Sequence, residues 1–260
     1  MTNCLLDSNV FLKLKHLEDT LQRIHQDEVL DIPIDAVRDI RCISPSQHPE
    51  KTNFTKDVGQ ARLLHDLASI ELQAMELGLR TLIEFPNTPL PFKQQLTQII
   101  LEESSHLKLC LEGIESFGFK WGEWPTHQKL WQCTSKSDDL LDRILIVHRY
   151  LEGAGLDASE KILRRLHDSN FLVTKQVVKK IADDEIRHVQ FGSQWFHFFC
   201  TSSGLDPNQE FQNRLRKIAH KLPKRLEKIN ISLRKKAGFT EQELRSLQEL
   251  QKEQRDLLNI

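Results

Sequence analysis

The sequence has few of the residues that interrupt helices and few of the patterns that build sheets. Its 260 residues include 10 glycines and 9 prolines, and runs in which apolar and polar residues alternate are scarce. A strand with one buried face shows that alternation, so a fold made mainly of β-sheet is excluded. Apolar residues recur instead at spacings of three and four from about residue 59 to about residue 200. This periodicity predicts an all-α fold.

Paired cysteines and an excess of one charge are also missing. The 5 cysteines are scattered without a Cys-x-x-Cys spacing, and their odd number argues against a closed disulfide framework. Lys and Arg number 36 against 37 Asp and Glu, so the chain as a whole has no bias toward nucleic acids or membrane surfaces. These features favour a reducing compartment and a partner that is recognised locally.

Long apolar runs are absent as well. No segment approaches the roughly 18 uninterrupted apolar residues of a membrane span. The N-terminus lacks the basic start and the apolar stretch of a signal peptide. We therefore expect a soluble, cytoplasmic protein with no membrane association. A chain of this length buries a large core without the help of disulfides.

Proline and glycine divide the periodic region into four long helices. Pro86, Pro89 and Pro91 separate the first helix from the second, and the segment from Gly118 to Pro125 closes the second. The connection over 118–137 is longer than the others, as in a bundle whose two halves are joined by a crossover. The predicted helices cover residues 59–85, 91–117, 138–167 and 170–200.

Flanking segments complete the predicted organisation. Residues 8–30 indicate a short amphipathic helix and 31–58 a Pro-containing loop, while 207–236 and 240–258 indicate two further helices. We expect these flanks to pack on the outside of the bundle. The chain then has three parts, which are an N-terminal helix and loop (1–58), the four-helix bundle (59–200) and a C-terminal helical extension (201–260).

Each of the four long helices has one glutamate in the middle of its apolar stripe. The positions three and four residues away from each of these acids are mostly apolar. An ionised carboxylate in an apolar core costs several kcal/mol, so four of them directed at one core require cations. The four acids are Glu71, Glu103, Glu152 and Glu185.

Two histidines complete this pattern. His106 and His188 each follow one of the glutamates by three residues, so carboxylate and imidazole share a helix face and reach the same ion. Two divalent ions balance four carboxylates, and neutral imidazoles add ligands without adding charge. One Glu from each of two helices plus Glu-x-x-His from the other two is the ligand set of di-iron and di-manganese carboxylate bundles. The predicted metal ligands are Glu71, Glu103, His106, Glu152, Glu185 and His188.

Neighbouring acids leave the assignment open at three points. Glu76 competes with Glu71, but it lies off the apolar stripe and four residues before Arg80, which favours a surface ion pair. Glu102 and Asp184 immediately precede two of the chosen acids and stand four residues before the same histidines. Each remains an alternative ligand.

Other residues near the pattern have a structural and a functional interpretation. His148, one turn before the third glutamate, is either a hydrogen-bond partner of a ligand carboxylate or a core histidine. Tyr150, the only tyrosine, points to a different face and is expected to pack structurally. Gly153 and Gly155 leave room for an oxidant or for a close helix contact. Cys110 is expected to act as a small apolar residue and not as a ligand.

Residues 214–236 form a basic stretch in a neutral chain, with many Lys and Arg against the single acid Glu227. Such a stretch is able to guide an anionic partner such as tRNA. It lacks the interleaved aromatic residues of a base-stacking platform. A solvated helix face is therefore the favoured interpretation.

Four stretches carry a family resemblance. HDLASIELQAMEL, EESSH, RYLEGAGLD and ADDEIRH together resemble the ferritin-like DUF455 proteins, over roughly residues 59–200. That group is similar to tRNA-modifying di-iron hydroxylases, and the resemblance implies a ferritin-like bundle that holds two iron ions, with manganese or a mixed pair also compatible with the ligands. It further implies molecular oxygen and an external electron donor as partners. The implied activity is that of an oxidoreductase acting on an unidentified organic substrate, either a small molecule or tRNA.

Two functions of other classes stay open. An iron-storage protein needs a hollow assembly, whereas we expect a monomer or a dimer. A structural or interaction protein would use the metal to staple its helices and would bind RNA through the basic stretch. Sequence alone identifies no catalytic residue beyond the metal ligands.

Overall fold

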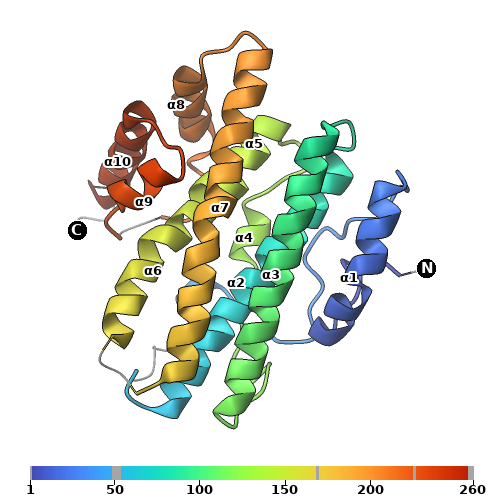
Figure 1. Ribbon diagram of the computed structural model, residues 1–260, viewed down its shortest axis with the longest axis vertical. Coiled ribbons are helices and arrows are strands. Elements are labelled where there is room, and N and C mark those ends of the chain that lie inside the picture. Colours follow the sequence, from blue (N-terminus) through green and yellow to red (C-terminus); the bar gives the residue numbers. More distant parts are fainter. Residues whose placement is uncertain (1, 49–53, 168–169, 225–226, 257–260) are drawn as a thin grey trace. The chain divides into compact units, whose positions relative to one another are not determined.

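The computed structural model describes residues 2–48, 54–167, 170–224 and 227–256 (Figure 1). The described chain is all-α, as predicted, and contains no strand; one isolated β-bridge joins Cys42 to Thr126. It divides into two compact units, residues 1–132 with 169–177 and residues 133–168 with 178–260. None of the described helices has the length and the apolar character needed to cross a bilayer.

A long helical hairpin forms the centre of the first unit. Helix α2 (Asp57–Glu84) packs along α3 (Leu90–Ser116), with a proline-rich turn between them. The helices approach closely at Gly78, where an added Cβ atom would lie 2.5 Å from Cγ1 of Ile100. Helix α2 buries residues over most of its circumference and α3 buries one face, so the polar residues inside the hairpin need an explanation.

The N-terminal helix and the crossover connection lie against this hairpin. Helix α1 (Val10–His25) starts at Asn9, whose side chain accepts the N–H groups of Phe11 and Leu12. A short 3₁₀ turn, η1 (Pro45–Gln47), and a four-residue helix, α4 (Lys129–Gln132), interrupt the loops. The side-chain oxygen of Gln73 on α2 accepts two N–H groups at the start of α4, which fixes the connection to the hairpin.

The second unit contains the predicted third helix in three pieces. Helix α5 (Leu140–Ile144) continues into η2 (Leu145–Leu151), a π-helix, and then into α6 (Glu152–Leu166). The N–H of Glu152 donates to the carbonyl oxygen of Val147, which is the five-residue spacing of a π-turn. A prediction based on a regular 3.6-residue period did not include this change of winding.

Helix α7 (Leu172–Ser202) belongs to the second unit from residue 178 onward, where it lies beside η2 and α6. An added Cβ atom at Gly192 would lie 2.5 Å from Cβ of His148 in η2. An added Cβ at Gly155 in α6 would lie 3.3 Å from Oε1 of Glu185. These two glycines allow α7 to approach η2 at one level and α6 at the other.

Three further helices complete the second unit. They are α8 (Pro207–Ile218), α9 (Ile231–Lys236) and α10 (Glu241–Asp256). The prediction of one helix over 207–236 was wrong, because Pro223 lacks the backbone N–H that a helix interior needs and the chain leaves the helix before it. The last positions of the predicted helix 240–258 lie outside the described residues. The predicted domain limits remain predictions.

Candidate metal centre

The hairpin of the first unit brings three of the predicted ligands together. Glu71 on α2 and Glu103 and His106 on α3 are all buried, with at most 4 % of each residue exposed. Nδ1 of His106 lies 3.2 Å from Oε2 of Glu71 and 3.6 Å from Oε2 of Glu103. One ligand atom from each residue falls within 4.8 Å of the others, a grouping that suits a shared metal ion.

Burial and mutual repulsion of the carboxylates dominate the electrostatics of this group of three residues. Burial, and next the charge of Glu103, raise the pKa of Glu71 well above its usual range, although His106 acts in the opposite direction. Burial alone would lower the pKa of His106, but its close contacts with Glu103 and Glu71 outweigh this and raise that pKa to about 10. Two buried carboxylates this close together favour a bound proton or cation between them. Carboxylate oxygens and an imidazole nitrogen form a donor set that suits divalent iron or manganese.

The competing acid Glu76 was predicted to form a surface ion pair with Arg80, and this prediction was wrong. Glu76 is only 1 % exposed. Its carboxylate receives Nζ of Lys13 at 2.9 Å and Nη1 of Arg38 at 2.7 Å. Arg80 pairs instead with Glu84, at 3.1 Å. The N-terminal segment supplies both cations of Glu76, and a period-based argument within one helix does not include such partners.

The second unit contains the other three predicted ligands. Glu152 opens α6 and accepts a hydrogen bond from Nδ1 of His148, which lies 2.8 and 2.9 Å from its two oxygens. On α7, Nδ1 of His188 lies 3.4 Å from Oε2 of Glu185. The Glu185 carboxylate faces α6 at Gly155. The prediction that His148 forms a hydrogen bond with the third glutamate is thus confirmed.

The two alternative ligands have other partners. Glu102 is partly exposed and accepts Nε2 of Gln98 at 3.0 Å. Asp184 pairs with Lys180 and, at 2.8 Å, with Arg187. These contacts favour Glu103 and Glu185 as ligands, and the assignment of the full set stays a prediction.

Three residues near the predicted ligands have contacts that fit a structural role. Tyr150 donates its hydroxyl to the carbonyl oxygen of Pro223 at 2.8 Å, consistent with a packing role. Cys110 is fully buried, and burial followed by the charges of Glu71 and Glu103 raises its thiol pKa well above the usual range. Gly153 serves a close contact, because an added Cβ there would lie 2.0 Å from Nη1 of Arg234.

The basic stretch 214–236 is largely neutralised within its own unit. Arg214 and Lys217 both contact Asp142, at 2.7 and 2.6 Å. Other pairs on this stretch join Lys221 to Asp138, Arg234 to Asp157 and Lys235 to Glu241. Arg225 and Leu226 lie outside the described residues. The paired side chains stabilise the fold more than they offer a free cationic surface.

Sequence reasoning missed a buried ion pair that lies one residue along the chain from His148 in the second unit. Arg149 donates from Nη1 and Nη2 to the two carboxylate oxygens of Glu243 at 2.7 and 2.8 Å. The pair joins residues 94 positions apart, so no local spacing reveals it. A partial signal exists, because Thr240 and Glu243 form a capping box at the start of α10.

Comparison with known proteins defines the family. A family model described as "Protein of unknown function (DUF455)" matches residues 9–245, and the chain therefore belongs to this family. An uncharacterized protein of Haemophilus influenzae is 30% identical over 241 residues, which cover 90% of this chain and 81% of the relative. No solved structure matches the chain.

Proposed function

We propose that the six predicted residues act as one centre for two metal ions and that the protein is a di-iron oxidoreductase of the oxygen-activating class. The observation that carries this proposal is the environment of Glu71, a buried carboxylate that faces a second buried carboxylate, Glu103. Among the described residues, no Lys or Arg lies within ion-pair distance of Glu71. A divalent cation would remove the repulsion and would use every donor of Glu71, Glu103 and His106.

The charges of the six residues balance two divalent ions. Four carboxylates carry four negative charges, and His106 and His188 contribute nitrogen ligands when they are neutral. Glu152 is likewise buried and has His148, not a Lys or Arg, as its ion-pair partner among the described residues. The ferritin-like resemblance implies the same set, with each Glu-x-x-His helix paired to a helix that brings one Glu.

The residues of the chain have separate roles in this centre. Glu71, Glu103, Glu152 and Glu185 would bind the ions, and burial of these side chains excludes bulk water. His148 orients the Glu152 carboxylate through its Nδ1 atom. An iron pair bound there would supply the redox chemistry that reduces oxygen, with electrons from an external donor. The class of substrate that we propose is a small organic molecule, because the basic stretch suited to tRNA is largely paired with acids.

The experiment that tests this function is an anaerobic titration with Fe(II), followed by exposure to oxygen. We expect two tightly bound iron equivalents per chain and oxygen consumption that an external reductant sustains. Glu103→Gln should lose iron binding, whereas Glu112→Gln, at an exposed position of the same helix, should behave as wild type. Iron that binds without any reaction toward oxygen would defeat the oxidoreductase proposal.

Two further measurements separate the alternatives. Light scattering distinguishes the monomer or dimer that we expect from the cage that iron storage requires. Anomalous scattering at the iron and manganese absorption edges identifies the ions, because carboxylate and imidazole ligands suit both metals. A cage that accumulates iron would replace the proposed function with storage.

A further inference from the structure

The π-helix η2 departs from regular α-helical winding, and it lies directly before Glu152, one of the proposed ligands. His148 lies within it, and Glu152 follows its last residue. π-Helices are rare, and they occur mainly as short insertions at functional sites. A stretch with such winding persists only where the surroundings over-determine it. The contacts that hold η2 therefore bear on how Glu152 is presented.

Arg149 is the first of these contacts. Its guanidinium is fully buried, and it binds both oxygens of Glu243 on α10. It also lies over three phenylalanine rings, 5.1 Å from the centroid of Phe196, 4.6 Å from that of Phe211 and 4.4 Å from that of Phe239. A bidentate pair inside an aromatic cage fixes the guanidinium in one orientation. The neighbour of His148 is thereby anchored to α7, α8 and α10.

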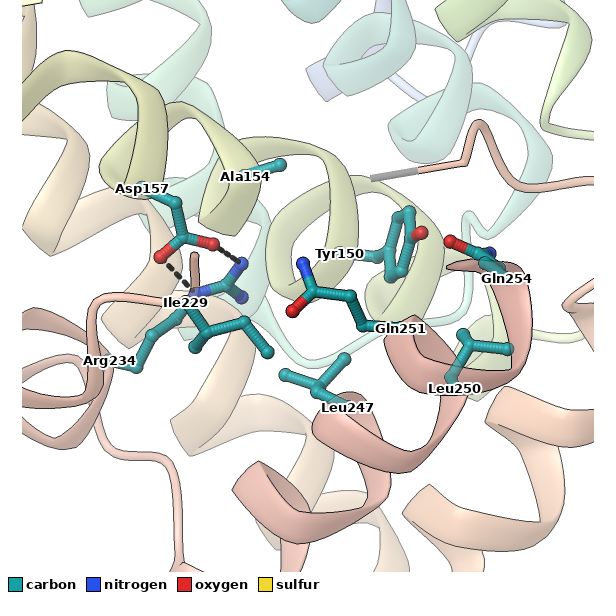
Figure 2. Close-up of a pocket in the computed structure, with 9 residues that line it drawn as sticks. All are labelled: Tyr150, Ala154, Asp157, Ile229, Arg234, Leu247, Leu250, Gln251 and Gln254. Atoms are coloured by element: carbon teal, nitrogen blue, oxygen red, sulfur yellow. Dashed lines mark hydrogen bonds and ion pairs between the residues drawn. The ribbon is translucent and has the colours of Figure 1, made fainter. Parts of the chain in front are cut away.

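Arg234 on α9 is the second contact. Its Nη1 donates to the backbone carbonyl oxygen of Arg149 at 2.8 Å, and its Nη2 binds Asp157 at 2.7 Å. Figure 2 shows this guanidinium reaching the Asp157 carboxylate at the edge of a small cavity that Tyr150 and Ala154 also line. The guanidinium occupies the space where a side chain at position 153 would begin. It thus binds the backbone of η2 from one side.

Both contacts carry costs that stability alone does not explain. A buried ion pair is often no more stable than apolar side chains of equal volume. A glycine inside a helix costs roughly 0.5–1 kcal/mol relative to alanine, and Gly153, directly after Glu152, admits the Arg234 guanidinium. The two costs coincide at the π-helix that presents His148 and Glu152.

We propose that Arg149, Arg234 and Glu243 are positioning residues that hold η2 in its π-wound form and so direct the Glu152 carboxylate to the metal. This inference rests on the proposed function, and it assigns the C-terminal helices α8 to α10 a role in metal binding. None of the three side chains contacts a metal in this account. They act through the backbone around His148.

The test uses variants that remove the geometry of the contacts without leaving a buried charge. In R149M/E243M both charges are replaced by apolar side chains of similar length, so the fold is retained. G153A displaces the Arg234 guanidinium. R214M is the matched control, because it breaks other ion pairs of the second unit, with Asp139, Asp142 and Glu210, none of which is a residue of η2. Binding of Fe(II) is titrated without oxygen, and amide exchange over 145–153 is followed in the metal-free proteins by mass spectrometry.

We expect wild type and R214M to bind two equivalents with equal affinity. R149M/E243M and G153A should bind one equivalent normally and the other at least tenfold more weakly, and their amides over 145–153 should exchange at least tenfold faster. Wild-type affinity for both equivalents in these two variants would overturn the positioning role while leaving the proposed function intact. A wild-type protein that binds no iron would defeat the proposed function itself.

Discussion

Glu71 and Glu76 stand little more than one turn apart on α2, and both are buried, yet their surroundings are opposite. Glu76 has a lysine and an arginine from the N-terminal segment as ion-pair partners. Glu71 has a second glutamate and a histidine. The protein thus neutralises one buried acid with its own Lys and Arg side chains and surrounds the other with a second acid and a histidine.

The second unit repeats this contrast. Glu243 is buried against Arg149 and His197, and Glu152 is buried against His148 alone among the described ion-pair partners. Each acid with an arginine or lysine partner joins two distant segments. Glu76 joins α2 to the N-terminal residues Lys13 and Arg38, and Glu243 joins α10 to η2. The predicted ligands lie within the helical pairs. The contrast separates carboxylates that have Lys or Arg partners from the carboxylates that we propose as metal ligands.

The largest expected effect is on stability at Glu76. Glu76→Gln leaves Lys13 and Arg38 buried without their counter-charge, so the metal-free protein should lose about 3–5 kcal/mol of unfolding free energy. Glu71→Gln should change it by less than about 1 kcal/mol, because the variant removes a charge that burial and the neighbouring Glu103 already disfavour. Urea denaturation measures both values. Equal losses for the two variants would erase the contrast.

Acid sensitivity is the next largest effect. Burial would raise the pKa of Glu243, but hydrogen bonds from His197 and Arg149, with the N–H of Thr240, lower it to about 2 from the ordinary value of 4.5. A lowered carboxyl pKa contributes stability above the unfolded value, and that stability is lost as the pH falls from about 4.5 to about 2. The contribution is about 3 kcal/mol.

The check is the pH dependence of unfolding in wild type and in R149M/E243M. Wild type should lose stability more steeply than the double variant between pH 4.5 and about pH 2, the ordinary pKa and the lowered pKa of Glu243. Parallel curves for the two proteins would show that Glu243 titrates as it does in the unfolded chain.

A smaller effect is expected at Gly192. Its substitution by alanine places a Cβ atom 2.5 Å from Cβ of His148, so α7 and η2 must separate. We expect Gly192→Ala to cost about 1–3 kcal/mol. Gly204→Ala has open space around its Cβ but a φ of +71°, so it serves as a control for backbone strain without helix contact. Thermal denaturation compares the two, and an unchanged Gly192→Ala variant would contradict the close approach.

The smallest effect is expected at Tyr150. Tyr150→Phe removes one hydrogen bond to the carbonyl oxygen of Pro223 and should cost about 0.5–1.5 kcal/mol. Iron binding and oxygen consumption should not change, because the hydroxyl contacts the C-terminal segment. Loss of activity at unchanged stability would give the only tyrosine a role in the chemistry.

Periodicity predicted the long helices because it reports burial along a single element. The first two predicted ranges, 59–85 and 91–117, differ from α2 and α3 by at most two residues. The same stripes predicted the buried positions of the six ligand candidates and gave the contact of His148 with Glu152 as one of two interpretations. Local patterns on a helix carry this information.

Periodicity failed where long-range partners decide the structure. The π-wound η2 has Arg234 and Glu243 from distant helices as partners, and a regular period does not encode such partners. The helical period placed Glu76 on the surface. It could not reveal that Lys13 and Arg38, far away in the sequence, neutralise this acid in the core. The end of the helix before Pro223 could have been predicted from the proline itself, but residues 207–236 were treated as one helix.

The most direct test of the central claim is iron binding by Glu71→Gln and Glu76→Gln, compared under conditions in which both proteins are folded. The two variants remove the same charge from the same helix at similar burial. We predict that Glu71→Gln loses at least one of two iron equivalents and that Glu76→Gln keeps both. Full iron binding by Glu71→Gln would contradict the account, because its buried acid would then need no metal.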